Sequence, residues 1–113
     1  MKQPCVYLLA SRREGTLYVG VTSDLLNRVA QHKSDLHPGF TSEHRVHRLV
    51  WFERHEFMVS AIRREKAIKE WRRAWKIRLI EETNGEWVDL YPGLVKVGKG
   101  GGLLGSGPRP LPG

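Results

Sequence analysis

The chain has 113 residues, a length typical of one small domain, and 40% of them are hydrophobic, which is enough for a single modest core. Its one cysteine, Cys5, excludes an intramolecular disulfide and a metal site built on a CxxC or Cys/His cluster. The apolar part of the N-terminal segment is too short for a signal peptide, and no apolar run approaches the ~20 residues of a membrane span. We therefore expect a cytoplasmic protein without a membrane partner.

The chain carries a strong excess of positive charge. Lysine and arginine number 19 against 12 for aspartate and glutamate, which gives a formal net charge of +7 and a pI near 10.0. This balance favours a polyanionic partner, above all nucleic acid, because Lys and Arg bind phosphates and release their counterions. A basic surface that is merely solvated has the same composition, so charge alone leaves both alternatives open.

Two short apolar runs near the N-terminus predict an antiparallel β-hairpin. The runs are "CVYLLA" at 5–10 and "LYVGVT" at 17–22, and the polar linker "SRREG" lies between them. A loop centred near residues 12–13 places Tyr7 across from Tyr18 to within about one position. Cross-strand neighbours share a face of the sheet, so both phenols can point the same way, although a slip of one residue would separate them.

A helix and a third strand are predicted next. The segment "TSDLLNRVAQHK" at 22–33 has a helical pattern, and Arg28 and His32 lie one turn apart at the edge of its apolar stripe. Farther along, the run "LVWF" at 49–52 is apolar without alternation, which is typical of a strand buried on both faces. This strand would complete a three-stranded sheet.

Residues 58–82 follow a helical pattern with two charges, Glu65 and Arg72, on its apolar face. Either the helix breaks near residues 73–74, or this face lines a site. Because a buried carboxylate is costly unless it is paired or bound to a metal, Glu65 is either a metal ligand or the partner of Arg72 or Lys69. Asn84, followed by Gly85, is a common helix stop. The apolar arc of this segment is formed by Ile62, Ile68, Trp75 and Leu79.

The C-terminal segment is rich in glycine and proline. From residue 92 it lacks the periodic apolar pattern of a packed element, so we predict a domain at 1–91 and a disordered tail at 92–113.

Tyrosine, arginine, histidine and glutamate together supply the groups that phosphodiester hydrolysis needs. The reaction requires a base for the attacking water, a cation for the charge that develops on the phosphate, and help for the leaving oxygen. A divalent metal on a carboxylate can supply the last. Taken singly, each of these residues also has an ordinary structural explanation as a packing, surface or turn residue.

The arrangement of these residues resembles the GIY-YIG nuclease family. The first family triplet corresponds to "CVY", with Cys5 and Val6 in place of glycine and isoleucine, and the second to "YVG". The spacing of Arg28 and His32 after the tyrosines also fits. The segments "GFTSEH", "RREKAIKEW" and "NGEWVDLY" resemble the small stand-alone bacterial members, so the resemblance covers about residues 3 to 91. It implies an α+β fold in which a three-stranded antiparallel sheet is flanked by helices.

The resemblance also implies the role of each residue in catalysis. Tyr7 and Tyr18 match the two motif tyrosines, one of which would help to deprotonate the attacking water. Arg28 matches the arginine that contacts the scissile phosphate. His32 matches the helix residue that assists a tyrosine or the phosphate.

Two further residues extend the implied site. Glu65 matches the single glutamate that holds the metal, expected to be Mg²⁺ or Mn²⁺, and Asn84 matches the late asparagine that supports the site. Lys33 and Arg72 are candidates for contacts with the nucleic acid. No small-molecule cofactor is implied.

We therefore predict a metal-dependent endonuclease, most simply one that acts on DNA in repair or recombination. One alternative is a nucleic-acid binding module with feeble cleavage or none, because a bare core of this size carries no added targeting domain. The other alternative is a protein with a structural role within a larger repair or RNA complex. The sequence leaves the choice between DNA and RNA, the substrate structure and the oligomeric state open.

Overall fold

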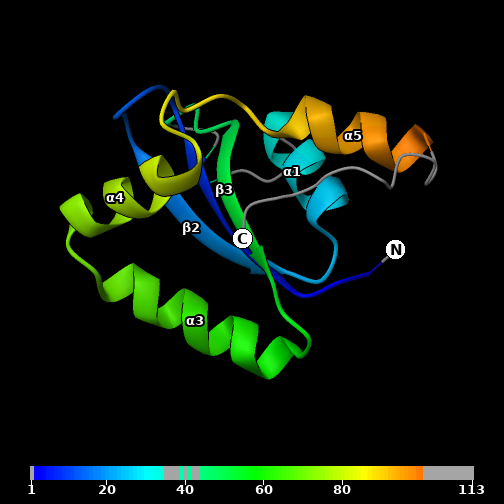
Figure 1. Ribbon diagram of the computed structural model, residues 1–113, viewed down its shortest axis with the longest axis horizontal. Coiled ribbons are helices and arrows are strands. Elements are labelled where there is room, and N and C mark those ends of the chain that lie inside the picture. Colours follow the sequence, from blue (N-terminus) through cyan, green and yellow to red (C-terminus); the bar gives the residue numbers. More distant parts are fainter. Residues whose placement is uncertain (1, 35–38, 40, 42–43, 101–113) are drawn as a thin grey trace.

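The computed structural model describes residues 2–34, 39, 41 and 44–100, and the side chains as far as residue 96. These residues form one three-stranded sheet and four labelled helices around it (Figure 1). The elements run in the order β1 (Cys5–Ala10), β2 (Leu17–Thr22), α1 (Leu25–Lys33), β3 (Arg48–Arg54), α3 (Met58–Glu70), α4 (Arg73–Thr83) and α5 (Tyr91–Gly100).

The three strands form one antiparallel sheet in the order β2-β1-β3, so the predicted fold class is confirmed. Tyr7 of β1 pairs with Gly20 of β2, and Tyr18 pairs with Leu9. The two tyrosines are therefore offset by two positions along the ladder, whereas an offset of about one position at most was expected. Because side chains alternate with a period of two, this even offset keeps both phenols on one face.

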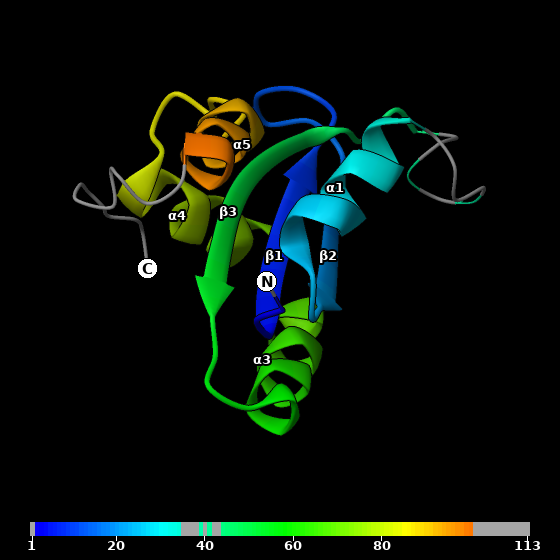
Figure 2. The ribbon, with the colours of Figure 1, turned by 90° about the vertical axis from the view of Figure 1, so that its right-hand side faces the viewer.

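Helices cover both faces of the sheet. In Figures 1 and 2, α3 and α4 lie against one face, and α1 and α5 lie against the other. The central strand β1 is buried along its whole length because both of its faces are covered. Its even-numbered residues pack toward α3 and α4, whereas Tyr7 and Leu9 pack toward α1 and α5.

The predicted helix at 58–82 is two helices. The chain breaks at Trp71 and Arg72, whose ψ angles of 150° and 156° are those of extended backbone, slightly before the position we had expected. A single helical arc drawn through this break is wrong, because the two helices have separate axes. Ile62 and Trp75 are accordingly 38% and 50% exposed, whereas Ile68 and Ile80 enter the core.

The predicted disordered tail also needs correction. Residues 91–100 form α5, with Pro92 in its first turn, a position that proline tolerates well. Leu90, Tyr91 and Leu94 pack against the core cluster beneath α1. The domain therefore extends past residue 91, while residues 101–113 of the predicted tail lie outside the described part of the chain. No helix in the described part is long and apolar enough to span a membrane.

Candidate active site

Three aromatic rings meet on the side of the sheet covered by α1. Tyr7 comes from the central strand, Tyr18 from the edge strand β2, and His32 from the last turn of α1. Their ring centroids lie 6.2 Å apart for the two tyrosines, 5.9 Å for Tyr7 and His32, and 5.4 Å for Tyr18 and His32. The structure thus brings three of the predicted site residues together.

Gly20 makes room for the Tyr7 ring. It is the cross-strand partner of Tyr7, and a Cβ atom at this position would lie 2.4 Å from Cζ and 2.5 Å from the hydroxyl of Tyr7. Any larger residue would push the ring away from His32. The glycine of "YVG" is therefore required by close approach of a side chain, which is a common reason for glycine inside a strand.

His32 links Tyr7 to a residue that the sequence analysis did not identify. Its Nε2 atom lies 3.0 Å from the Tyr7 hydroxyl, and its Nδ1 atom lies 3.1 Å from the Thr41 hydroxyl. A neutral imidazole has one donor and one acceptor nitrogen. The Thr41 hydroxyl can donate or accept, so both hydrogen bonds are satisfied in either tautomer, and together they hold the imidazole beside the Tyr7 phenol.

Burial strongly raises the pKa of the Tyr7 phenol above its ordinary value of about 10. The neighbouring Tyr18 phenol reinforces the rise. The Arg28 guanidinium opposes it, through its charge and through a hydrogen bond to the phenol. Arg28 therefore belongs to the same cluster, and Tyr7 is a neutral phenol at physiological pH.

Glu65 lies on α3, the helix that covers the opposite face of the sheet. Its carboxylate is buried and forms an ion pair with Lys69, at 2.6 Å. The hydrogen bond to Glu65 is the main cause of the raised pKa of Lys69. Burial opposes the rise, and the charges of Glu65 and Tyr18 add to it. Tyr18, on the edge strand β2, thus contributes to the raised pKa of both Tyr7 and Lys69.

Comparison with known proteins identifies the family. A sequence model of the GIY-YIG catalytic domain matches residues 3–78, which include every element from β1 to the first half of α4. The chain belongs to the GIY-YIG family.

Small bacterial members of this family are similar to the chain. UPF0213 proteins of Staphylococcus aureus, from strains Mu3 and N315 among others, are 36% identical to it over 69 residues, which is 61% of this chain and 84% of each relative. The solution NMR structure of a UPF0213 protein from Bacillus halodurans covers 77% of this chain and 92% of its own, with 26% identity and a TM-score of 0.49.

The GIY-YIG family implies a divalent metal, and Glu65 fits such an ion as a single carboxylate ligand. Mg²⁺ is commonly held by one or two carboxylates and completes its shell with water and substrate phosphate oxygens. The described residues contain no cluster of three or more His, Cys, Asp or Glu side chains suited to a metal. Lys69 is 53% exposed on its side-chain surface, so a metal can replace it beside Glu65 without stranding a buried cation.

Asn84 lies away from the aromatic cluster. It caps the end of α4, where its amide nitrogen donates to the carbonyl oxygens of Val50 and Val88 and its amide oxygen accepts from the Val88 N–H. The bond to Val50 ties the end of α4 to β3, and the two bonds to Val88 close the turn that follows α4. The role that the geometry gives Asn84 is thus to position these elements, and none of its recorded contacts reaches a tyrosine.

The two residues predicted to contact nucleic acid lie in different settings. Lys33 forms an ion pair with Asp89, donates to the carbonyl oxygen of His47 and lies 5.3 Å from the centre of the Tyr91 ring. Its charge therefore helps to hold α5 against α1. Arg72 lies at the start of α4 on the opposite side of the sheet, with its guanidinium 5.4 Å from the centre of the Trp75 ring.

The sequence analysis did not assign roles to Gly20, Thr41 and Asp89. Gly20 had a signal, because it is an isolated glycine within a predicted strand. Asp89 also had a signal, because an aspartate two residues before a Tyr-Pro pair is typical of a helix start. In the structure, Asp89 accepts from the N–H groups of Leu49 and Tyr91. The sequence around Thr41 contains no pattern that predicts its contact with His32.

Proposed function

We propose that this GIY-YIG protein is an endonuclease that hydrolyses phosphodiester bonds in DNA, with a divalent metal at Glu65. The observation that carries the proposal is the grouping of Tyr7, Tyr18, Arg28 and His32 on one face of the sheet, with Tyr18 also acting on Lys69, the ion-pair partner of Glu65. This grouping offers a cation, phenols and a carboxylate around a single edge strand.

The two tyrosines have different roles in this proposal. Tyr7 is fully buried and its raised pKa keeps it protonated, so it acts as a positioned hydrogen-bond donor rather than as the base. Tyr18 is half-buried on the edge strand, where water can reach it. We therefore assign the contact with the attacking water to Tyr18.

Arg28 stabilises the negative charge that grows on the phosphate oxygens during attack. Its guanidinium already acts on the Tyr7 phenol before substrate binds. A phosphate that approaches the rings would therefore meet a cation that is already oriented, which lowers the reorganisation cost of reaching the transition state.

The metal would be held by Glu65 and by the phosphate itself. When bound, such an ion stabilises negative charge on phosphate and leaving-group oxygens. Lys69 neutralises the buried carboxylate of Glu65 when no metal is present. Its exposed ammonium can then move into solvent or toward the phosphate backbone.

The substitution Glu65→Gln tests the proposal, because it keeps the volume of the side chain and removes its charge. We expect the variant to fold with a free energy of unfolding within about 1 kcal/mol of wild type, since the Lys69 that loses its partner is well hydrated. It should still bind DNA and lose metal-dependent nicking of supercoiled plasmid. Mg²⁺ or Mn²⁺ should raise the melting temperature of wild type but not of the variant.

Glu70→Gln provides the matched control, because Glu70 is an exposed carboxylate on the same helix. It should nick plasmid and respond to metal like wild type. Nicking by Glu65→Gln at the wild-type rate would refute the metal assignment. A salt-sensitive complex with DNA but no nicking by wild type would instead favour a binding module on the same fold.

A further inference from the structure

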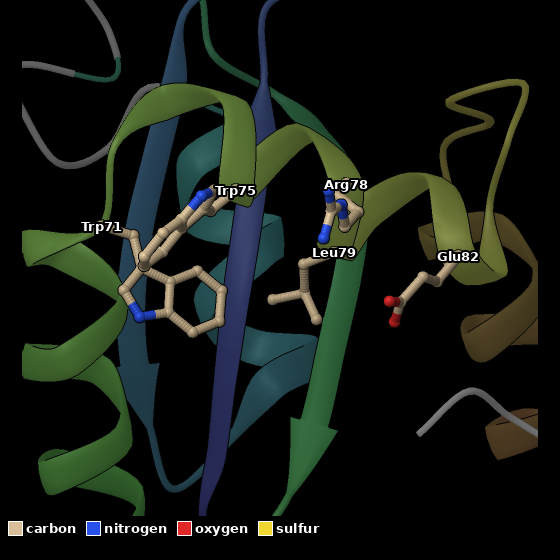
Figure 3. A pocket seen from close by; sticks show the side chains of 5 residues that line it. All are labelled: Trp71, Trp75, Arg78, Leu79 and Glu82. Carbon is tan, nitrogen blue, oxygen red and sulfur yellow. The ribbon is translucent and has the colours of Figure 1, made fainter.

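A shallow hollow lies at the junction of α3 and α4, on the side of the sheet opposite the aromatic cluster. Its volume is about 190 Å³, well below the ~300–1,000 Å³ of pockets that enclose a drug-sized ligand. Figure 3 shows two indoles at one end, Glu82 at the other end, and Arg78 and Leu79 between them. The hollow is lined by Trp71, Trp75, Arg78, Leu79 and Glu82.

The two indoles form a rigid aromatic corner. The rings of Trp71 and Trp75 meet edge to face, with centroids 6.1 Å apart and an interplanar angle of 76°. Trp71 packs partly against the core, whereas Trp75 is 50% exposed. The corner thus anchors one ring and presents the other to solvent.

An arginine guanidinium also lies over each indole ring. The guanidinium of Arg64 lies 5.5 Å from the centre of the Trp71 ring, and that of Arg72 lies 5.4 Å from the centre of the Trp75 ring. These cation–π contacts fix the ring planes and place positive charge beside them.

The surrounding stretch of chain is the most basic part of the protein. Residues 63–78 contain eight of its 19 lysines and arginines but only two of its 12 acidic residues. A fixed aromatic surface within a dense positive charge is the combination that binds single-stranded nucleic acid, because bases stack on the rings and phosphates follow the cations.

We propose that the hollow binds an unpaired base of single-stranded DNA, which stacks on Trp75 while the adjoining phosphates lie along Arg72 and Arg78. The carboxylate of Glu82 repels phosphate, so the backbone lies along the arginines and away from Glu82. The base edge then points toward Glu82, which accepts a hydrogen bond from an exocyclic amino group.

The position of the hollow gives it a part in substrate choice. Trp71 caps the C-terminal end of α3, six residues after Glu65, which corresponds to a rise of roughly 9 Å, the length of about two to three nucleotides of stacked strand. As far as it concerns cleavage, the inference rests on the proposed nuclease function. It predicts that the enzyme cuts close to an unpaired stretch in preference to fully paired duplex.

The test is the binding of a fluorescent single-stranded DNA oligonucleotide by the full chain in EDTA, followed by anisotropy. Trp75→Ala should weaken the affinity by at least about tenfold, as for the loss of one base–aromatic stack. Trp75→Phe should retain most of it. Phe57→Ala is the matched control, because Phe57 is also an exposed aromatic, 64% exposed, at the other end of α3, and it should bind like wild type.

Salt dependence separates stacking from phosphate contact. Arg78→Gln should reduce the slope of log affinity against log salt by about 0.7, the value for one phosphate contact on a single strand. Trp75→Ala should leave this slope unchanged, since an indole neutralises no phosphate.

Three outcomes would overturn the inference: an equal loss of affinity in Trp75→Ala and Phe57→Ala, equally tight binding of duplex, or a dimer that Trp75→Ala dissociates. Tighter binding of RNA than of DNA of the same sequence would overturn the assignment to DNA. Because binding is measured without metal, absence of nicking would refute the nuclease function alone and leave the binding result standing.

Discussion

The two sides of the sheet use aromatic residues in opposite ways. Beneath α1, Tyr7 is wholly buried, and its polar atom is held by His32 and Arg28. Beside α4, Trp75 is half exposed and its neighbours are cations on the surface. The first arrangement holds buried polar atoms in fixed positions, as the proposed chemistry requires, and the second offers exposed area and charge, as the proposed contact with single-stranded DNA requires.

The difference follows from what each environment costs. A buried polar group must be satisfied or it destabilises the protein, so Tyr7 and His32 can be placed only where their partners are fixed as well. An exposed indole with an arginine beside it has no such requirement. Chemistry is therefore expected to be sensitive to small shifts on the α1 side, whereas binding should depend on the α4 side.

The largest expected effect is that of Arg28→Ala on the cleavage rate. Loss of one stabiliser of transition-state charge should slow nicking by about 100-fold or more. Affinity for DNA should fall much less, because the basic stretch of α3 and α4 remains. Arg72→Ala provides the contrast, since it should weaken binding while leaving the single-turnover rate on saturating DNA nearly unchanged.

Gel-shift titration and single-turnover kinetics on both variants measure this contrast. A loss of affinity in Arg28→Ala large enough to explain all of its lost activity would mean that Arg28 binds rather than stabilises the transition state. Catalysis and DNA binding would then not be separated between the two sides of the sheet.

The next effect is that of Gly20→Ala on stability and on the ring cluster. The added Cβ would lie 2.4 Å from the Tyr7 ring, so the ring or the strand must move, at a cost of about 1–3 kcal/mol in the free energy of unfolding. Nicking should be lost even where the variant folds. Gly85→Ala, whose Cβ meets only the Glu81 carbonyl oxygen at 3.9 Å, should unfold in urea nearly like wild type.

The smallest effect is a change in alkaline stability that depends on Tyr7. The folded pKa of this phenol is raised, so its contribution is complete below the unfolded pKa of about 10 and is lost as pH rises toward the folded value, because the unfolded chain gives up the proton first. Wild type should therefore lose stability above pH ~10, by up to about 1.4 kcal/mol per pH unit from this group.

Tyr7→Phe removes that titration, so its free energy of unfolding should fall less steeply over the same interval. Its stability at neutral pH should be lower by about 1–3 kcal/mol, because His32 loses a buried partner. Urea titrations at several pH values measure both effects. Equal alkaline slopes in the two proteins would mean that Tyr7 is not held neutral by burial.

Local patterns determined the sheet and much of the site. The strands are short apolar runs with turn residues between them, and an even offset in the hairpin leaves Tyr7 and Tyr18 on one face. The helical spacing of Arg28 and His32 is likewise a property of adjacent turns. The strands and the helical spacing depend on residues a few positions apart, so the amino-acid sequence was sufficient to predict them, whereas the register of the hairpin was left open and only the structure decided it.

Tertiary contacts decided the rest. The break at Trp71, the packing of α5 through Leu94, and the ion pair of Lys33 with Asp89 join segments that are distant in sequence or whose local patterns are ambiguous. A glycine- and proline-rich segment forms a helix here because it has an apolar surface to pack on, a gain that outweighs its poor propensity. The free energy that selects such contacts comes from burial between elements, and no short stretch of sequence contains that information.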